Sequence, residues 1–198
     1  MTAVASAVIG YLVGGVPTAD WISAGGGIDL RGSGSHNPGA NNAWRLSGPL
    51  LAAGVLATEM LKGIAIVVVG SFLGGQAGVV AAAIGGVTGN VLNPYRRFSG
   101  GQGLGITAGL LLASSPLMAV SAIGVIGVVA WRTRSSAVAA LAAVGTLVVA
   151  AVVLPVGPWG LTHWTHRVVL AVGLGAVISP KQVRRIRRRD PGGFRSAR

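Results

Sequence analysis

The sequence contains no cysteine, and it is poor in acidic residues and histidine, with four Asp or Glu and three His among 198 residues. Without cysteine the protein can form no disulfide and offers no thiolate ligand. The three histidines are scattered along the chain, so the sequence predicts neither a structural metal site nor a metal cofactor. No other cofactor is expected.

Charge of either sign is also scarce. Only 10% of the residues are charged, whereas a soluble domain carries about 25%, and 52% are hydrophobic. A soluble domain of this size could not bury so much apolar surface. Long apolar stretches separated by short basic loops are typical of membrane proteins. The sequence therefore predicts an all-α integral membrane protein.

The charges that are present are mostly basic. Sixteen Lys or Arg residues give a net charge of +12, and eight of them lie in residues 181–198. No basic patch alternates with aromatic residues on a polar domain, so the basic segment favours membrane lipid headgroups as partner rather than nucleic acid. We expect a single polytopic membrane domain over residues 1–180 and a basic cytoplasmic tail over residues 181–198.

The apolar stretches divide most economically into seven transmembrane helices. The N-terminal stretch lacks a charged n-region and is longer than a typical signal sequence, so we expect it to be retained as a span. Pro116 removes a helix donor and divides the long stretch 103–131 into two short helices. The predicted helices cover residues 3–23, 49–72, 77–92, the two parts of 103–131, 137–154 and 168–178.

The distribution of Lys and Arg predicts the orientation of these helices. Placing the loops 24–48, 93–102 and 132–136 and the tail 179–198 on one side gathers fourteen bases there and leaves only Arg167 on the other. Basic loops face the cytoplasm. We therefore expect the N-terminus outside, the C-terminus in the cytoplasm, and the chain in the plasma membrane.

The first cytoplasmic loop is rich in glycine and in hydrogen-bond donors. Its polar residues include Ser35, His36, Asn37, Asn42 and Arg45. Glycines allow the backbone to approach an oxyanion, and arginine binds one bidentately, so the loop favours phosphate. The alternative is an ordinary Gly/Asn turn between helices. His36 is a candidate general base, since its ordinary pKa lies near neutrality, or else a solvated loop histidine.

The second cytoplasmic loop contains another glycine-rich turn. It begins after Gly89-Asn90 and ends with Ser99-Gly100-Gly101-Gln102-Gly103 at the start of a predicted helix. Because helix N-termini favour negative charge, this turn is a possible anion cradle, although membrane loops also use glycine freely. Arg96 and Arg97 in the same loop are more typical of topology markers than of ligands.

Two charged residues lie inside a predicted span. Glu59 and Lys62 are three residues apart, which places them on one helix face. Buried charges within a membrane are costly and are usually paired or functional. Mutual neutralisation is preferred here to a direct catalytic role.

The two loops together resemble those of the membrane glycerol-3-phosphate acyltransferases that use acyl phosphate as the donor. Residues Gly10 to Pro17 are similar to the first helix of that family, and Glu59 to Gly63 to its Asp-x-x-Lys-Gly sequence. The family pattern GSGNxGATNxxR is matched at Ser35, Asn37, Gly39, Ala40, Asn42 and Arg45. The pattern GHxxPxxxxFKGGKG is matched at Gly89, Pro94, Phe98, Gly100, Gly101 and Gly103.

This resemblance implies a seven-helix enzyme that transfers a fatty acyl group from acyl phosphate to the 1-hydroxyl of glycerol 3-phosphate. The products are lysophosphatidic acid, a phospholipid precursor, and phosphate. Because acyl phosphate is a mixed anhydride with a good leaving group, the site must chiefly bind phosphate and aim the hydroxyl. The resemblance implies substrate binding by Ser35, Asn37, Asn42, Arg45, Ser99, Gly100, Gly101, Gly103 and Arg185.

The chain departs from the family pattern at several positions. Both lysines of the family's Lys-Gly-Gly-Lys-Gly turn are replaced, by Ser99 and Gln102, and its histidine is replaced by Asn90. We take Asn90, Gln102 and His36 as the candidate catalytic residues. The alternatives are a divergent enzyme that acylates another acceptor and a non-catalytic lipid-binding or scaffold protein. A transporter is less favoured, because no internal repeat is found.

Overall fold

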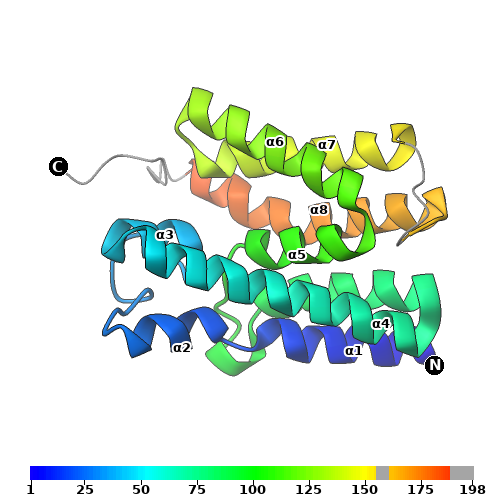
Figure 1. The fold of residues 1–198 in the computed structure, drawn as a ribbon, viewed down its shortest axis with the longest axis horizontal. Helices are drawn as coiled ribbons and strands as arrows, with labels where there is room; N and C mark the ends of the chain where they lie inside the picture. The colour runs from blue at the N-terminus through cyan, green and yellow to red at the C-terminus, as the bar shows by residue number, and fades with distance from the viewer. Residues whose placement is uncertain (155–160, 188–198) are drawn as a thin grey trace.

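The computed structural model describes residues 1–154 and 161–187, and the described part of the chain is helical. Figure 1 shows most helices running side by side along the long axis of the molecule. The all-α prediction is therefore confirmed. The elements are α1 (Thr2–Gly15), α2 (Thr18–Gly25), α3 (Ala40–Ser47), α4 (Pro49–Val91), the 3-10 turn η1 (Pro94–Arg96), α5 (Leu104–Ser114), α6 (Pro116–Thr133), α7 (Ser136–Val153) and α8 (Trp164–Arg187).

Helix α4 is two helices joined by a sharp reversal. Gly74 and Gly75 have non-helical backbone angles, and Gly75 has φ of 55°, a region that glycine enters without steric cost. The chain runs from α3 along the molecule and returns beside α1, as Figure 1 shows. The predicted pair of helices over residues 49–72 and 77–92 is thus confirmed.

Other helix boundaries differ from the predicted ones. The expected helix 3–23 is interrupted at Val16 and Pro17, because proline has no N–H to donate and disfavours a helical conformation in the residue before it. The predicted break before Pro116 is present. Helix α3 lies in a segment expected to be loop, and α8 continues past residue 178 to Arg187, with Pro180 inside it.

Helix α1 packs against the returning half of α4 through glycines. An added Cβ would stand 2.1 Å from the Ala82 oxygen at Gly10, 1.9 Å from the Gly86 oxygen at Gly14, and 1.9 Å from the Tyr11 oxygen at Gly89. A side chain at any of these positions would therefore meet backbone. Such close approach is how small residues stabilise helix pairs in membranes.

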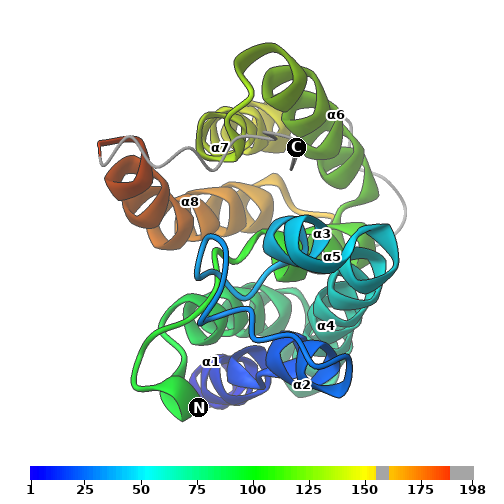
Figure 2. The same ribbon diagram turned by 90° about the vertical axis from the view of Figure 1, so that its left-hand side faces the viewer.

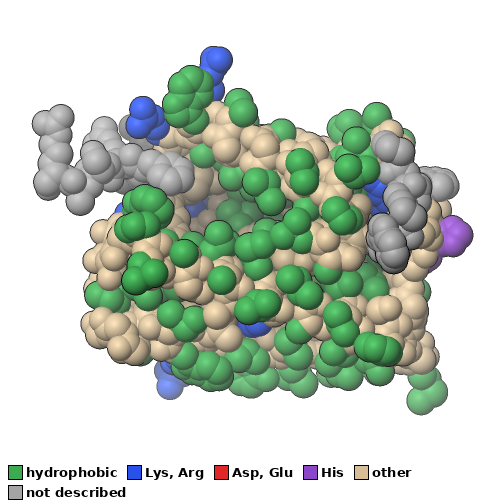
Figure 3. All heavy atoms as spheres, viewed as in Figure 1, with side chains coloured by type: hydrophobic (Ala, Val, Ile, Leu, Met, Phe, Trp, Pro, Cys, Tyr) green, Lys and Arg blue, Asp and Glu red, His purple; other side chains and the backbone are tan. Residues whose placement is uncertain are grey.

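The surface of the helical bundle is apolar. Large hydrophobic side chains such as Phe72, Val120 and Val153 are exposed, and Figure 3 shows hydrophobic side chains over the flank of the molecule. In the described residues, four helical stretches are long and apolar enough to cross a membrane, namely Thr2–Gly25, Pro49–Arg96, Pro116–Thr133 and Ser136–Val153; α5 is apolar but shorter. These features are those of an integral membrane protein.

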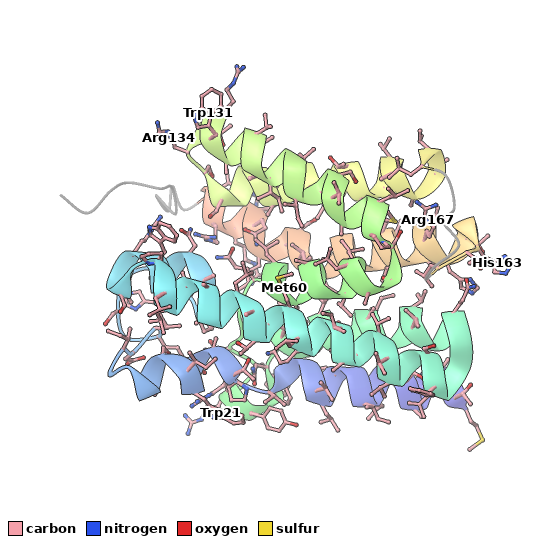
Figure 4. All side chains as sticks on the ribbon, viewed as in Figure 1. Trp21, Met60, Trp131, Arg134, His163 and Arg167 are labelled. Atoms are coloured by element: carbon pink, nitrogen blue, oxygen red, sulfur yellow. The ribbon has the colours of Figure 1, made fainter. Side chains whose placement is uncertain are left out.

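The polar loops gather at one end of the bundle. Figure 2 looks onto that end and shows α2, α3 and the loops around them, with the C-terminal part of α8 nearby. In Figure 4, Trp131 and Arg134 mark this end, and His163 and Arg167 mark the opposite one. Arg167 is buried and donates to the Leu154 and Ala150 carbonyls at the end of α7, where a cation is favoured by the helix dipole.

Candidate functional site

The first and second loops are joined by Arg31. Its Nη1 donates to the Ser99 carbonyl at 2.8 Å, and its Nε donates to both carboxylate oxygens of Asp20 at 3.0 and 3.1 Å. Arg96 of the second loop binds the same carboxylate at 3.2 Å. Asp20 on α2 therefore connects both basic loops. The two predicted phosphate-binding loops lie against each other.

Asn90, at the end of α4, shapes the glycine turn. The Gly101 N–H donates to the Asn90 carbonyl at 2.9 Å, and the Gly103 N–H donates to the Asn90 Oδ1 at 3.2 Å. A Cβ at Gly100 would lie 2.0 Å from the Asn90 carbonyl oxygen, so only glycine fits there. Two of the N–H groups expected to form an anion cradle are thus bound to Asn90.

Helix α8 reaches the same turn. Lys181 Nζ donates to the Gly100 carbonyl and, at 2.7 Å, to the Gly101 carbonyl. The Gln182 Nε2 donates to the Gln102 Oε1 at 3.5 Å. Burial, together with the charges of Arg31 and Arg185, lowers the pKa of Lys181 to about 8. The turn is therefore held by α4, which precedes it in the sequence, and by α8, which follows it.

Glu59 and Lys62 form the predicted ion pair, with Oε1 and Nζ 2.7 Å apart and each residue 8% exposed. Further hydrogen bonds reach both the Glu59 carboxylate and the Lys62 ammonium group. Thr18 Oγ1 donates to Glu59 at 2.9 Å, Asn90 Nδ2 donates to it at 2.7 Å, and Lys62 donates to the Val16 carbonyl at 2.8 Å. That carbonyl belongs to the break between α1 and α2. The pair therefore ties this break to the residue that shapes the turn.

Asn42, near the start of α3, organises the first loop through the hydrogen bonds of its side chain. It is 1% exposed, and its Oδ1 accepts from the Ser35 N–H at 2.9 Å. Its Nδ2 donates to the carbonyls of Leu30 at 2.8 Å and Ser33 at 3.1 Å. The side chain thus folds the loop around itself. Gly34 precedes Ser35 and has φ of 62°. A Cβ at Gly34 would lie 2.3 Å from the Asn42 Oδ1, so a larger residue does not fit there.

His36 lies exposed on the first loop, with Nδ1 2.8 Å from the Arg31 carbonyl. Because a carbonyl only accepts, Nδ1 must carry the hydrogen, and the neutral ring then has Nε2 as an acceptor. The backbone φ of His36 is 55°, and Arg97 and Phe98 of the second loop have φ of 50° and 59°. Non-glycine residues in this region are uncommon and concentrate at functional sites.

Two cavities border these loops. The smaller, about 10 Å³, has room for about one water molecule and is lined by residues that include Asp20, Arg31, Pro38, Glu59, Lys62, Asn90 and Gly101. The larger, about 380 Å³, lies among α2, the first loop and Arg96. Of the predicted site residues, Asn90 and Gly101 line the smaller cavity. Ser35, His36, Asn37 and Arg45 line neither, and Arg45 lies half-buried on α3.

Three residues that the sequence did not single out join the two loops and α8. From the sequence, Arg31 and Lys181 entered only the count of basic residues that predicts the orientation, and Asp20 was given no role in the site. Nothing in the spacing of Lys181 indicates a contact with a turn eighty residues earlier.

Known proteins are similar to this chain in sequence or in fold. A glycerol-3-phosphate acyltransferase of Synechococcus sp. (strain JA-3-3Ab) is 39% identical over 148 residues, which are 72% of this chain and 73% of that protein. Glycerol-3-phosphate acyltransferase 1 of Rhizobium johnstonii is 36% identical over 172 residues, 86% of this chain and 80% of that one. The crystal structure of PlsY, an integral membrane glycerol 3-phosphate acyltransferase, in its glycerol 3-phosphate form has the same fold, with a TM-score of 0.78 at 23% identity, over 100% of this chain and 96% of that one.

The fold and the site define a helical integral membrane protein with a glycine turn held between basic loops at one end. The chain belongs to the glycerol-3-phosphate acyltransferase family, whose model matches residues 4–189. It is thus a membrane acyltransferase of phospholipid synthesis.

Proposed function

We propose that this chain transfers a fatty acyl group from acyl phosphate to the 1-hydroxyl of glycerol 3-phosphate at the cytoplasmic face of the plasma membrane. The observation that carries the proposal is the contact between the two loops, made by Arg31 Nη1 on the Ser99 carbonyl at 2.8 Å. It allows groups from both loops to surround one substrate. Relatives of this chain are named for the same acceptor.

The reaction requires positioning more than activation. The hydroxyl oxygen of glycerol 3-phosphate forms a bond to the acyl carbonyl carbon, the bond from that carbon to the phosphate oxygen breaks, and phosphate leaves with the electron pair. The hydroxyl proton passes to a base, for which His36 Nε2 is available in the neutral ring. Cations near the phosphates stabilise the charge that develops on the leaving group.

The other predicted residues divide into two groups. We propose that Ser35, Asn37, Arg45 and Arg185, with the turn Ser99, Gly100, Gly101 and Gly103, contact the substrates, and that Gln102 donates its amide N–H. Asn42 and Asn90 are buried, and their side chains bond to the backbone of the loops that they shape and, for Asn90, also to Glu59. We therefore propose that these two act on substrate through the loops.

The acyl chain would enter from the membrane. On the face shown in Figure 3 the surface is hollowed below α6, and hydrophobic side chains line the hollow. An acyl chain lying there would keep its methylene groups in apolar surroundings, at about 0.8 kcal/mol for each CH₂ removed from water.

For the membrane topology we propose seven spans, formed by α1, the two halves of α4, α5, α6, α7 and residues 168–178 of α8, with the N-terminus outside. This assignment is supported by the position of Arg134 and of Arg167 at opposite ends of the bundle. Because the natural chain has no cysteine, single introduced cysteines report sidedness without background. In intact cells, Thr162→Cys should react with an impermeant maleimide, and Ser47→Cys should react only after permeabilisation. The reverse pattern would contradict the orientation.

The proposed reaction is tested with purified full-length protein in lipid. Wild type supplied with acyl phosphate and glycerol 3-phosphate should release phosphate and form lysophosphatidic acid. Arg45→Ala should lower kcat/KM roughly tenfold to a hundredfold, since a charge-assisted contact to a dianionic substrate contributes roughly 1.5–3 kcal/mol and about 1.4 kcal/mol corresponds to a factor of ten. Phosphate release and product chromatography measure both.

The matched control is Arg134→Ala, which removes the same charge from the exposed turn between α6 and α7 and should leave turnover unchanged. Product formation only with another acceptor would contradict the proposed acceptor and favour a divergent enzyme. Absence of turnover with every acceptor and acyl chain length tested would contradict the reaction itself.

A further inference from the structure

Lys181 brings an ammonium group from the last helix to the second loop. It lies beyond the predicted span 168–178, and its Nζ donates to the carbonyls of Gly100 and Gly101. An ammonium group carries three donors, so these two bonds leave one for a further acceptor. Lys181 is half-buried, so its ammonium group is only partly in contact with bulk water.

The charged groups acting on Lys181 are both cations, Arg31 and Arg185. Arg31 donates to the Ser99 carbonyl, next to the carbonyls that Lys181 binds. Asp20 offsets part of the Arg31 charge but is shared with Arg96. Like charges held together in partly buried surroundings raise each other's free energy, and a bound anion relieves that repulsion. The arrangement is thus complementary to an anion.

The glycine turn itself carries no positive side chain. Positions 99 and 102 are Ser and Gln, and the N–H groups of Gly101 and Gly103 are bound to Asn90. A phosphate at this turn therefore needs its positive charge from another segment. Lys181 is the cation that contacts the turn at the glycines themselves.

We propose that Lys181 supplies, from α8, the positive charge that binds the substrate phosphate at the glycine turn. This inference rests on the proposed function for the identity of the phosphate-bearing substrate. It makes Lys181 a substrate-binding residue as well as a support for the turn.

Kinetics of the full-length enzyme in lipid separate binding from support. Lys181→Gln keeps hydrogen-bond donors for the turn but loses the charge, and it should raise the KM for glycerol 3-phosphate roughly tenfold to a hundredfold. Lys181→Arg should stay within a few-fold of wild type. The matched control is Arg184→Gln, an exposed position on the same helix, which removes the same charge and should leave KM unchanged.

The pH dependence of KM gives a second readout that a purely supporting role would not produce. A lysine with its pKa lowered to about 8 is charged below that pH and loses its charge above it. The wild-type KM should therefore rise as the pH increases from 8 to 9.5, while glycerol 3-phosphate stays a dianion because its second pKa is near 6. Lys181→Gln and Lys181→Arg should show no such rise, since a glutamine amide carries no charge and a guanidinium introduced at position 181 does not lose its charge in this range.

Calorimetric titration with inorganic phosphate, read together with the kinetics, distinguishes failure of the Lys181 proposal from failure of the proposed reaction. If turnover is normal but Lys181→Gln keeps the wild-type KM and its pH dependence, the role of Lys181 is overturned and the proposed reaction stands. If wild type turns over no acyl phosphate yet binds phosphate in a Lys181-dependent way, the reaction is overturned and the anion site stands. If wild type binds no phosphate at millimolar concentration and Lys181→Gln has no effect, the Lys181 proposal fails.

Discussion

Replacing Glu59 by leucine should destabilise the folded protein by about 3–5 kcal/mol, because it leaves the Lys62 ammonium buried without its partner. Glu59 is 8% exposed and lies 2.7 Å from Lys62. The change also removes the acceptor of the hydrogen bonds from Thr18 and Asn90. Since Asn90 shapes the glycine turn, activity should fall along with stability.

Unfolding of the protein in mixed micelles by denaturant measures the change in free energy. The informative control is the double variant Glu59→Leu, Lys62→Leu, in which no charge remains unpaired. Buried ion pairs replaced by apolar residues are often neutral in stability, so the double variant should regain most of the loss. A single variant as stable as wild type, or a double variant less stable than the single one, would show that the pair is not buried as described.

Gly14→Val should prevent stable folding, because its Cβ would lie 1.9 Å from the Gly86 carbonyl oxygen. Real Cβ atoms do not approach backbone so closely, and a carbonyl within a helix cannot move aside. Helices α1 and α4 would have to separate along their whole contact. Overpacking usually costs 1–3 kcal/mol when side chains can adjust, and here the obstacle is backbone, so we expect a larger loss of several kcal/mol.

The yield of monodisperse protein in detergent and its thermal midpoint measure this effect. Gly145→Val is the matched control, because nothing lies within 4 Å of a Cβ at this exposed position on α7. Its yield and midpoint should equal those of wild type. Normal behaviour of Gly14→Val would contradict the close packing of α1 on α4.

Hydrophobic length and proline placement were sufficient to predict most helices. The halves of α4 and the break before Pro116 follow from apolar runs and from the missing proline N–H. The interruption at Pro17 has the same cause, the missing proline N–H. It was not predicted, because the apolar run continues across Pro17. Helix α3 was not predicted, because the segment Ala40–Ser47 is short and polar. Its composition is typical of a loop.

The site was predictable at the level of loops but not of individual contacts. Glycines and polar residues identified both loops, and the spacing of Glu59 and Lys62 predicted their ion pair. The sequence could not show that Asn42 and Asn90 would turn inward and bind the loop backbone. Nor could it show Lys181 against the glycine turn, because such contacts depend on how distant helices pack.

The partner of α1 has a consequence for how the chain is assembled during synthesis. The surface that α1 packs on lies in the returning half of α4, around Ala82 and Gly86. At 5–20 residues per second, about 70 further residues take roughly 4–14 s to emerge from the ribosome. Until then the glycine face of α1 has only lipid or the insertion machinery against it. Lys181 emerges later still, so a nascent chain acquires all the residues of the proposed phosphate site only when its last helix is made.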